Sequence, residues 1–216
     1  MSEFQYYKFE RLDGYLDAKA RQALRAISSR AEISATAFQV YYTYSDLKAE
    51  PFELMLKYFD IGFYYADWGS IDVYIKLPAG TLPDALLGFS SDGLHVHEND
   101  EWQLLIFSLE EYGEYFDDEH ADDFFQHLAA LRGGLMQGDW RLVYLMWLKA
   151  FDFNDDVERV PLIQFDFEHL SEEEQAFAAL YDIPLALVKA LAMVLSEQPS
   201  HQAKQTQLTL DAWIHN

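Results

Sequence analysis

His95 and His97 are the residues whose type and spacing come closest to a metal-binding pattern. They lie two positions apart in a strand-like segment, which places both imidazoles on one face. With nearby carboxylates and His120 they could hold zinc, manganese or iron, because imidazole and carboxylate are ligands for these metals. The alternative is a pair of solvent-facing polar residues at the end of a hairpin. The chain has no His-Glu-x-x-His sequence that would favour the metal site.

Three other segments match catalytic or phosphate-binding motifs only in part. Residues 88–93 resemble a nucleophile elbow, but the second glycine is one place too far along and a strand is expected next. Residues 133–139 lack the Lys-Ser/Thr pair of a phosphate-binding loop, so we expect two helix ends there, with Asp139 capping the second helix. The Asp46-x-Lys48 spacing also occurs in some nucleases, but a match of two residues is too short to indicate that activity. No cofactor motif is present, and we expect no cofactor.

The acidic residues are concentrated in one segment. Residues 78–131 hold thirteen carboxylates and no lysine or arginine, out of a net charge of −22 for the chain. The densest part runs from Glu110 to Asp123 and includes the aromatic residues Tyr112, Tyr115 and Phe116. It is either a solvated loop and helix start or a docking face for a basic protein, because interfaces combine aromatic centres with charged rims.

These patterns leave three functions open. The first is a non-enzymatic binding or adaptor protein that engages a basic partner through the acidic segment. Its expected contact residues are Glu110, Glu111, Glu114, Tyr115, Asp117, Asp118, Glu119, Asp122 and Asp123. The second is a metal-dependent hydrolase around His95, His97 and His120, and the third is an inhibitor that mimics nucleic acid.

Composition narrows the class of protein. The 216 residues are 50% hydrophobic and 16% aromatic, which supports a substantial core and excludes a disordered acidic chain. The absence of cysteine excludes disulfides, thiolate metal sites and a cysteine nucleophile. The acidic balance disfavours direct nucleic-acid binding and anionic membranes. The first residues show neither a basic leader nor an apolar segment, so we expect a cytoplasmic protein.

Hydrophobic periodicity predicts an α+β fold. We expect strands at residues 4–9, 37–44, 61–66, 71–77, 94–97 and 102–109, with helices at 17–27 and 51–58. From residue 122 the apolar spacing is helical, and Ser171 to Glu174 forms a capping-box sequence. The pattern therefore predicts a mixed sheet with hairpins and flanking helices in residues 1–109, an acidic connector at 110–123 and a helical part at 124–216. These parts could also form one continuous domain.

The first third of the chain resembles an uncharacterised family of bacterial proteins. The resemblance is carried by Tyr6-Tyr7-Lys8-Phe9-Glu10, by residues 24–31, by residues 44–48, and by Tyr58-Phe59-Asp60 with Tyr65-Ala66-Asp67-Trp68-Gly69. The family pattern has Trp-Gly-Asp in place of Tyr44-Ser45-Asp46 and Asn-Trp-Gly-Thr in place of residues 67–70. The resemblance implies no activity, ligand or catalytic residue.

Overall fold

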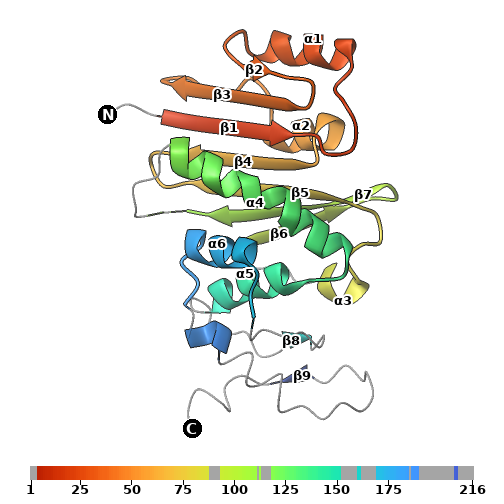
Figure 1. The fold of residues 1–216 in the computed structure, drawn as a ribbon, viewed down its shortest axis with the longest axis vertical. Coiled ribbons are helices and arrows are strands. Elements are labelled where there is room, and N and C mark those ends of the chain that lie inside the picture. Colours follow the sequence, from red (N-terminus) through yellow and green to blue (C-terminus); the bar gives the residue numbers. More distant parts are fainter. Residues whose placement is uncertain are drawn as a thin grey trace.

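An antiparallel sheet of seven strands forms the centre of the computed structural model (Figure 1). The structure describes residues 4–87, 93–110, 112, 118–151, 160–161, 169–184, 186–189 and 207–208. The strands are β1 (Phe4–Glu10), β2 (Glu32–Ile33), β3 (Ala37–Thr43), β4 (Ile61–Ala66), β5 (Ile71–Pro78), β6 (Leu94–Glu98) and β7 (Trp102–Leu109). Their order is β2-β3-β1-β4-β5-β7-β6, so the first strand lies inside the sheet. The short strands β8 (Val160–Pro161) and β9 (Gln207–Leu208) form a separate pair.

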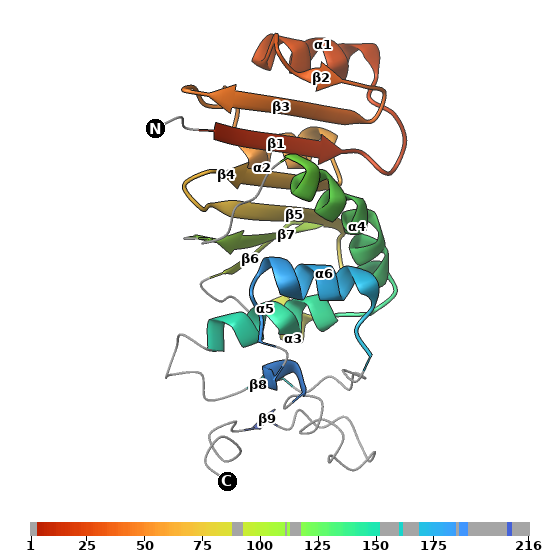
Figure 2. The same ribbon diagram turned by 60° about the vertical axis from the view of Figure 1, so that its left-hand side comes forward.

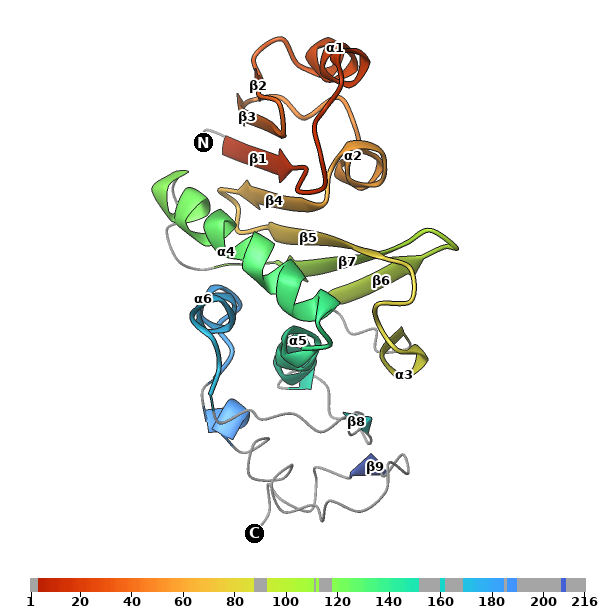
Figure 3. The same ribbon diagram turned by 45° about the vertical axis from the view of Figure 1, so that its right-hand side comes forward.

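Helices cover both faces of this sheet. They are α1 (Ala18–Ile27), α2 (Pro51–Tyr58), α3 (Asp84–Leu87), α4 (Asp118–Met136), α5 (Arg141–Phe151) and α6 (Glu172–Leu180). Helix α4 crosses one face diagonally, whereas α1 and α2 lie on the other face (Figure 3). Helices α5 and α6 pack side by side near the β6 end of the sheet (Figure 2). None of the helices in the described part of the chain is both long and apolar enough to cross a membrane.

Two hydrophobic cores lie on the two faces. The larger core joins alternate residues of β4, β5 and β7 to α4, α5 and α6. Across it the ring centroids of Phe63 and Phe124 lie 5.6 Å apart. The smaller core packs β1 and β3 against α1 and α2 around Phe9, Phe38 and Met55. Because residues from both predicted parts of the chain enter the larger core, α4–α6 and the sheet stabilise one another.

Local signals explain where several elements begin. The Asp17 carboxylate accepts from the backbone N–H of Ala20 and caps α1, and Pro51 occupies the first turn of α2. The predicted capping box is formed, because Ser171 and Glu174 each accept a hydrogen bond from the other's backbone N–H. Gly62 lets Phe9 and Met55 approach β4, since a Cβ there would lie 2.5 Å from the Phe9 ring.

The α+β class is confirmed, and β4 and β7 have the predicted bounds. The sheet is antiparallel at each described pairing rather than mixed, because two hairpins and a central β1 join strands running in opposite directions. The helix break expected within residues 133–139 is found there: α4 continues through Gly133 and Gly134 to Met136, the break lies at Gly138, whose φ is +86°, and α5 begins at Arg141. The glycine-containing turn at 88–92 lies outside the described residues.

A buried ionic cluster joins the ends of three elements. The Asp60 carboxylate, before β4, accepts from the backbone N–H groups of Leu12 (2.8 Å) and Asp13 (3.1 Å) and lies 3.4 Å from Lys76 Nζ. Arg132 of α4 donates to the Lys76 carbonyl at 2.8 Å and to Asp13 at 2.7 Å. Burial acts to raise the pKa of Asp60, but these N–H groups and the two cations lower it overall.

Candidate functional site

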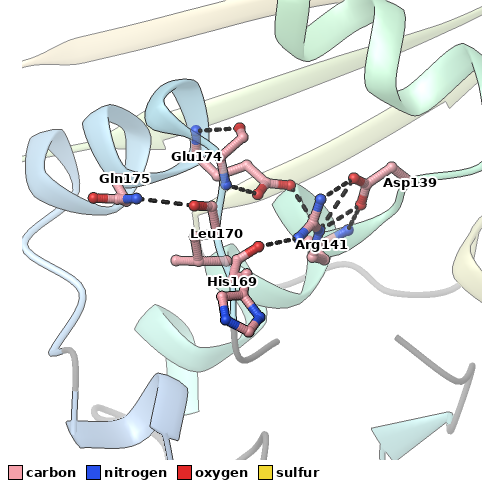
Figure 4. Close-up of polar contacts among 7 residues, drawn as sticks. Asp139, Arg141, His169, Leu170, Glu174 and Gln175 are labelled. Atoms are coloured by element: carbon pink, nitrogen blue, oxygen red, sulfur yellow. Dashed lines mark hydrogen bonds and ion pairs between the residues drawn. The ribbon is translucent and has the colours of Figure 1, made fainter. Parts of the chain in front are cut away.

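A cleft of about 400 Å³ lies between the end of α4 and the starts of α5 and α6. Gly133, Gly134 and Gln137 line it together with a cluster of charged residues, Asp139, Arg141 and Glu174. Figure 4 shows this cluster, with the guanidinium of Arg141 between the two carboxylates. In this cleft titratable groups and a hollow occur together, and so it is the first candidate for chemistry.

Arg141 binds both carboxylates and a carbonyl. Its Nε lies 2.9 Å from Asp139 Oδ1 and 3.0 Å from Glu174 Oε1. Its Nη1 donates to the carbonyl oxygen of His169 at 2.6 Å, and its Nη2 donates to Asp139 Oδ2. The second oxygen of Glu174 accepts from the backbone N–H of Ser171 at 2.7 Å. All four carboxylate oxygens are therefore engaged.

The two carboxyl groups differ in pKa. Burial raises the pKa of Glu174, the Asp139 charge adds to that rise, and the Ser171 N–H and Arg141 oppose it. Burial also acts to raise the pKa of Asp139, but the hydrogen bonds from Arg141 lower it overall. Opposite shifts of this kind occur in acid–base pairs. Here both groups are held by Arg141 or a helix cap, so we interpret the cluster as a clamp between α5 and α6.

Part of this clamp was visible in the sequence. Asp139 is a predicted cap, and it does accept from the backbone N–H of Arg141 at 3.2 Å. Ser171 and Glu174 are the predicted capping box. No local signal joins Arg141 to Glu174, because 33 positions separate them and only the packing of α5 on α6 brings them together.

The structure does not bring the three metal-ligand candidates together. His95 and His97 are exposed on β6, opposite Ile106 and Leu104 of β7, and so lie on the face that α1 and α2 cover. His97 packs edge-on against Phe52 of α2 at 5.0 Å. His120 belongs to α4 on the other face. In the alternative of a metal site these three histidines would be grouped, but the structure places His120 apart from the other two. The described residues contain no group of three or more His, Cys, Asp or Glu that could hold a metal ion.

The acidic segment is described in part. Glu110 and Asp123 are exposed, whereas Asp122 accepts from Lys8 Nζ at 2.6 Å and from the Tyr6 hydroxyl at 2.7 Å. Asp122 therefore fastens the start of α4 to β1, a role that the sequence did not reveal. Asp118 and Glu119 lie in the first turn of α4. The remaining predicted contact residues, Glu111, Glu114, Tyr115 and Asp117, lie outside the described residues.

Four exposed carboxylates lie at one end of the sheet, and we call them the acidic rim. They are Asp46, Asp67, Glu110 and Asp123. Gln5 of β1 donates to Asp46 at 2.7 Å, and the Asp67 N–H donates to the Phe4 carbonyl at 3.0 Å. Glu110 follows the end of β7, and Asp123 adjoins Asp122, which is bonded to β1. The same end of the sheet therefore holds the end of β3, the β4–β5 turn and the start of α4 (Figure 1).

Two exposed aromatic side chains share this end. Tyr44 is 72% exposed and follows Thr43, the residue of β3 that pairs with Phe4. Trp68 is 51% exposed and follows Asp67 in the β4–β5 turn. Neither was selected from the sequence as a contact residue, because aromatic residues beside strands usually belong to the core.

Comparison with known proteins gave no match: no protein-family model, no curated protein and no solved structure is similar enough to this chain to be counted. The resemblance of the first third to a bacterial family therefore stays an expectation.

Proposed function

We propose that this protein is a cytoplasmic, non-enzymatic binding or adaptor protein that engages a basic protein partner through the acidic rim. One observation carries the proposal. From Tyr58 to Leu148, each exposed Asp, Glu, Lys or Arg that the structure describes is a carboxylate. A surface of one sign attracts an oppositely charged partner and increases its association rate.

The basic residues between Tyr58 and Leu148 support the same interpretation. Lys76 and Arg132 are bound in the cluster around Asp60, and Arg141 is bound in the clamp. The exposed cations of the described residues lie outside this stretch: Lys19, Arg21, Arg25, Arg30, Lys48 and Lys57 precede it, on or near α1 and α2, and Lys189 follows it. The division of charge disfavours a nucleic-acid mimic, because such a mimic needs carboxylates over most of a face.

A defined basic probe tests the proposal. A fluorescently labelled peptide of nine arginines, titrated with the protein at low and physiological salt, stands in for the partner. Replacing Glu110 and Asp123 by Gln and Asn should weaken binding and make it less dependent on salt, because exposed charges are screened over about 8 Å at physiological salt. The matched control replaces Glu32 and Glu53, two exposed carboxylates outside the rim, by Gln.

The two variants change the net charge equally, so they separate position from total charge. The control should bind the peptide almost as the parent does. If both variants lose the same affinity, only the net charge matters and the rim is not a binding surface.

A further inference from the structure

The exposed aromatic residues at the acidic rim are held on fixed backbone. The chain after Tyr44 is tied to β1 by the Gln5–Asp46 hydrogen bond, and Tyr7 donates its hydroxyl proton to Gln5. Trp68 lies in a turn closed by the Gly69 N–H on the Ala66 carbonyl at 2.9 Å, and its Nε1 donates to Ser70 Oγ at 2.9 Å. Little conformational entropy would therefore be lost if a partner covered them.

The backbone at Tyr44 is also unusual. Its φ is +68°, in the left-handed region that a bulky residue adopts rarely. The residue is 72% exposed, so its ring is not held there by burial in the core. Backbone conformations of this kind gather at binding sites, where the surrounding structure enforces them.

Spacing allows one partner to touch both rings. Tyr44 and Trp68 flank the start of β1, because Phe4 pairs with Thr43 on one side and bonds to Asp67 on the other. Neighbouring strands lie about 4.8 Å apart, so the two positions are separated by about 10 Å across the sheet. Side chains on one face of an extended segment lie about 7 Å apart at two residues and about 13 Å apart at four, so this separation falls within the range that one segment spans.

The charge around the rings selects the partner. Asp46 lies two positions after Tyr44, and Asp67 directly precedes Trp68. Glu110 lies near the same turn, since the Tyr112 N–H is bonded to the Gly69 carbonyl at 2.9 Å. One exposed cation, Lys48, shares the loop with Asp46 among the described residues. An arginine side chain suits these surroundings better than a lysine side chain, because the planar guanidinium can stack on an aromatic ring while it binds carboxylates.

We infer that Tyr44 and Trp68, framed by Asp46, Asp67 and Glu110, form a docking surface for an arginine-bearing segment of a protein partner. This inference rests on the proposed function and names the partner chemistry that the acidic rim recognises. The aromatic rings supply the stacking contact, and the carboxylates supply the charge that attracts and orients the guanidinium groups.

The experiment compares labelled peptides of nine arginines and nine lysines. The parent should bind the arginine peptide more tightly, and the double variant Tyr44→Ala/Trp68→Ala should bind it about tenfold more weakly while its lysine-peptide affinity changes less. Tyr15→Ala is the control, because Tyr15 is 78% exposed but lies in the β1–α1 connection. Thermal unfolding of each variant checks that the fold is kept.

The outcomes separate the two proposals. If the rim carboxylate variant weakens binding but the aromatic variant does not, the acidic rim stands and the arginine surface is refuted. Equal loss for both peptides, or equal loss for Tyr15→Ala, also refutes the surface, because stacking at these two rings predicts neither. If neither the carboxylate nor the aromatic variant changes affinity, the proposed function fails as well.

Discussion

Removing the Asp60 carboxylate should be one of the most damaging single changes to this fold. Its side chain is 11% exposed, and that of Lys76 is 16% exposed. Asp60→Ala would leave a buried ammonium without its counter-charge and free the N–H groups of Leu12 and Asp13. Breaking one side of a buried ion pair costs about 3 to 5 kcal/mol. We expect a loss of that size in the free energy of unfolding, a large fraction of the stability of a typical domain.

Urea unfolding followed by circular dichroism measures this loss. The double variant Asp60→Ala/Lys76→Met should recover about 1 kcal/mol or more, because it also removes the unpaired charge. Recovery should be partial, since Lys76 Nζ also donates to the Met55 carbonyl at 2.8 Å. Asp13→Asn is the comparison: the Asp13 side chain is 69% exposed, although that of Arg132 is 8% exposed, so losing this pair should cost less than losing the Asp60 carboxylate.

The pH dependence has a definite sign. The folded-state pKa of Asp60 lies below its unfolded value, so the ionised group stabilises the fold above about pH 4. That stabilisation is lost as pH falls through the folded-state pKa. The stability gap between the parent and Asp60→Asn should therefore narrow on acidification. An Asp60→Ala variant as stable as the parent, or a gap that widens at low pH, would refute this account of the cluster.

Three further outcomes follow from packing and placement. Gly62→Ala should lower the free energy of unfolding by about 1 to 3 kcal/mol, because the added Cβ would lie 2.5 Å from the Phe9 ring. Gly133→Ala should instead stabilise α4 by up to about 1 kcal/mol, because a Cβ there would have nothing within 4 Å; urea midpoints in the opposite order would contradict this packing. Trp147→Ala should cost about 3 to 5 kcal/mol, because Trp147 is 5% exposed, and the exposed Gln126 of α4 provides an alanine control. Added zinc should not raise the melting temperature, since His95 and His97 lie on the opposite face from His120; a rise abolished by His97→Ala would show that a site exists at β6.

Local structure was largely readable from the sequence. Alternating apolar residues located β4 and β7, Pro51 and Tyr58 bound α2 as predicted, and the capping box at Ser171 starts α6. Trp147, in the stretch whose apolar spacing predicted helix, is buried in α5. These features depend on residues that lie within a few positions of one another in the sequence, so they can be predicted from the sequence directly. The charge of the acidic segment is likewise a property of the sequence alone.

Tertiary structure decided what these elements bring together. The central position of β1 depends on pairing with β3 and β4, and β5 pairs with β7 rather than with the nearer β6. Long-range packing also separates His95 and His97 from His120, fastens Asp122 of α4 to Lys8 of β1, and places Tyr44 and the Trp68 turn on either side of the start of β1. Local periodicity carries no information on such contacts, because strand order is set by the joint burial of both faces of the sheet. The sequence therefore contains the carboxylates of the rim, but only the tertiary structure brings together the four separate segments that carry them.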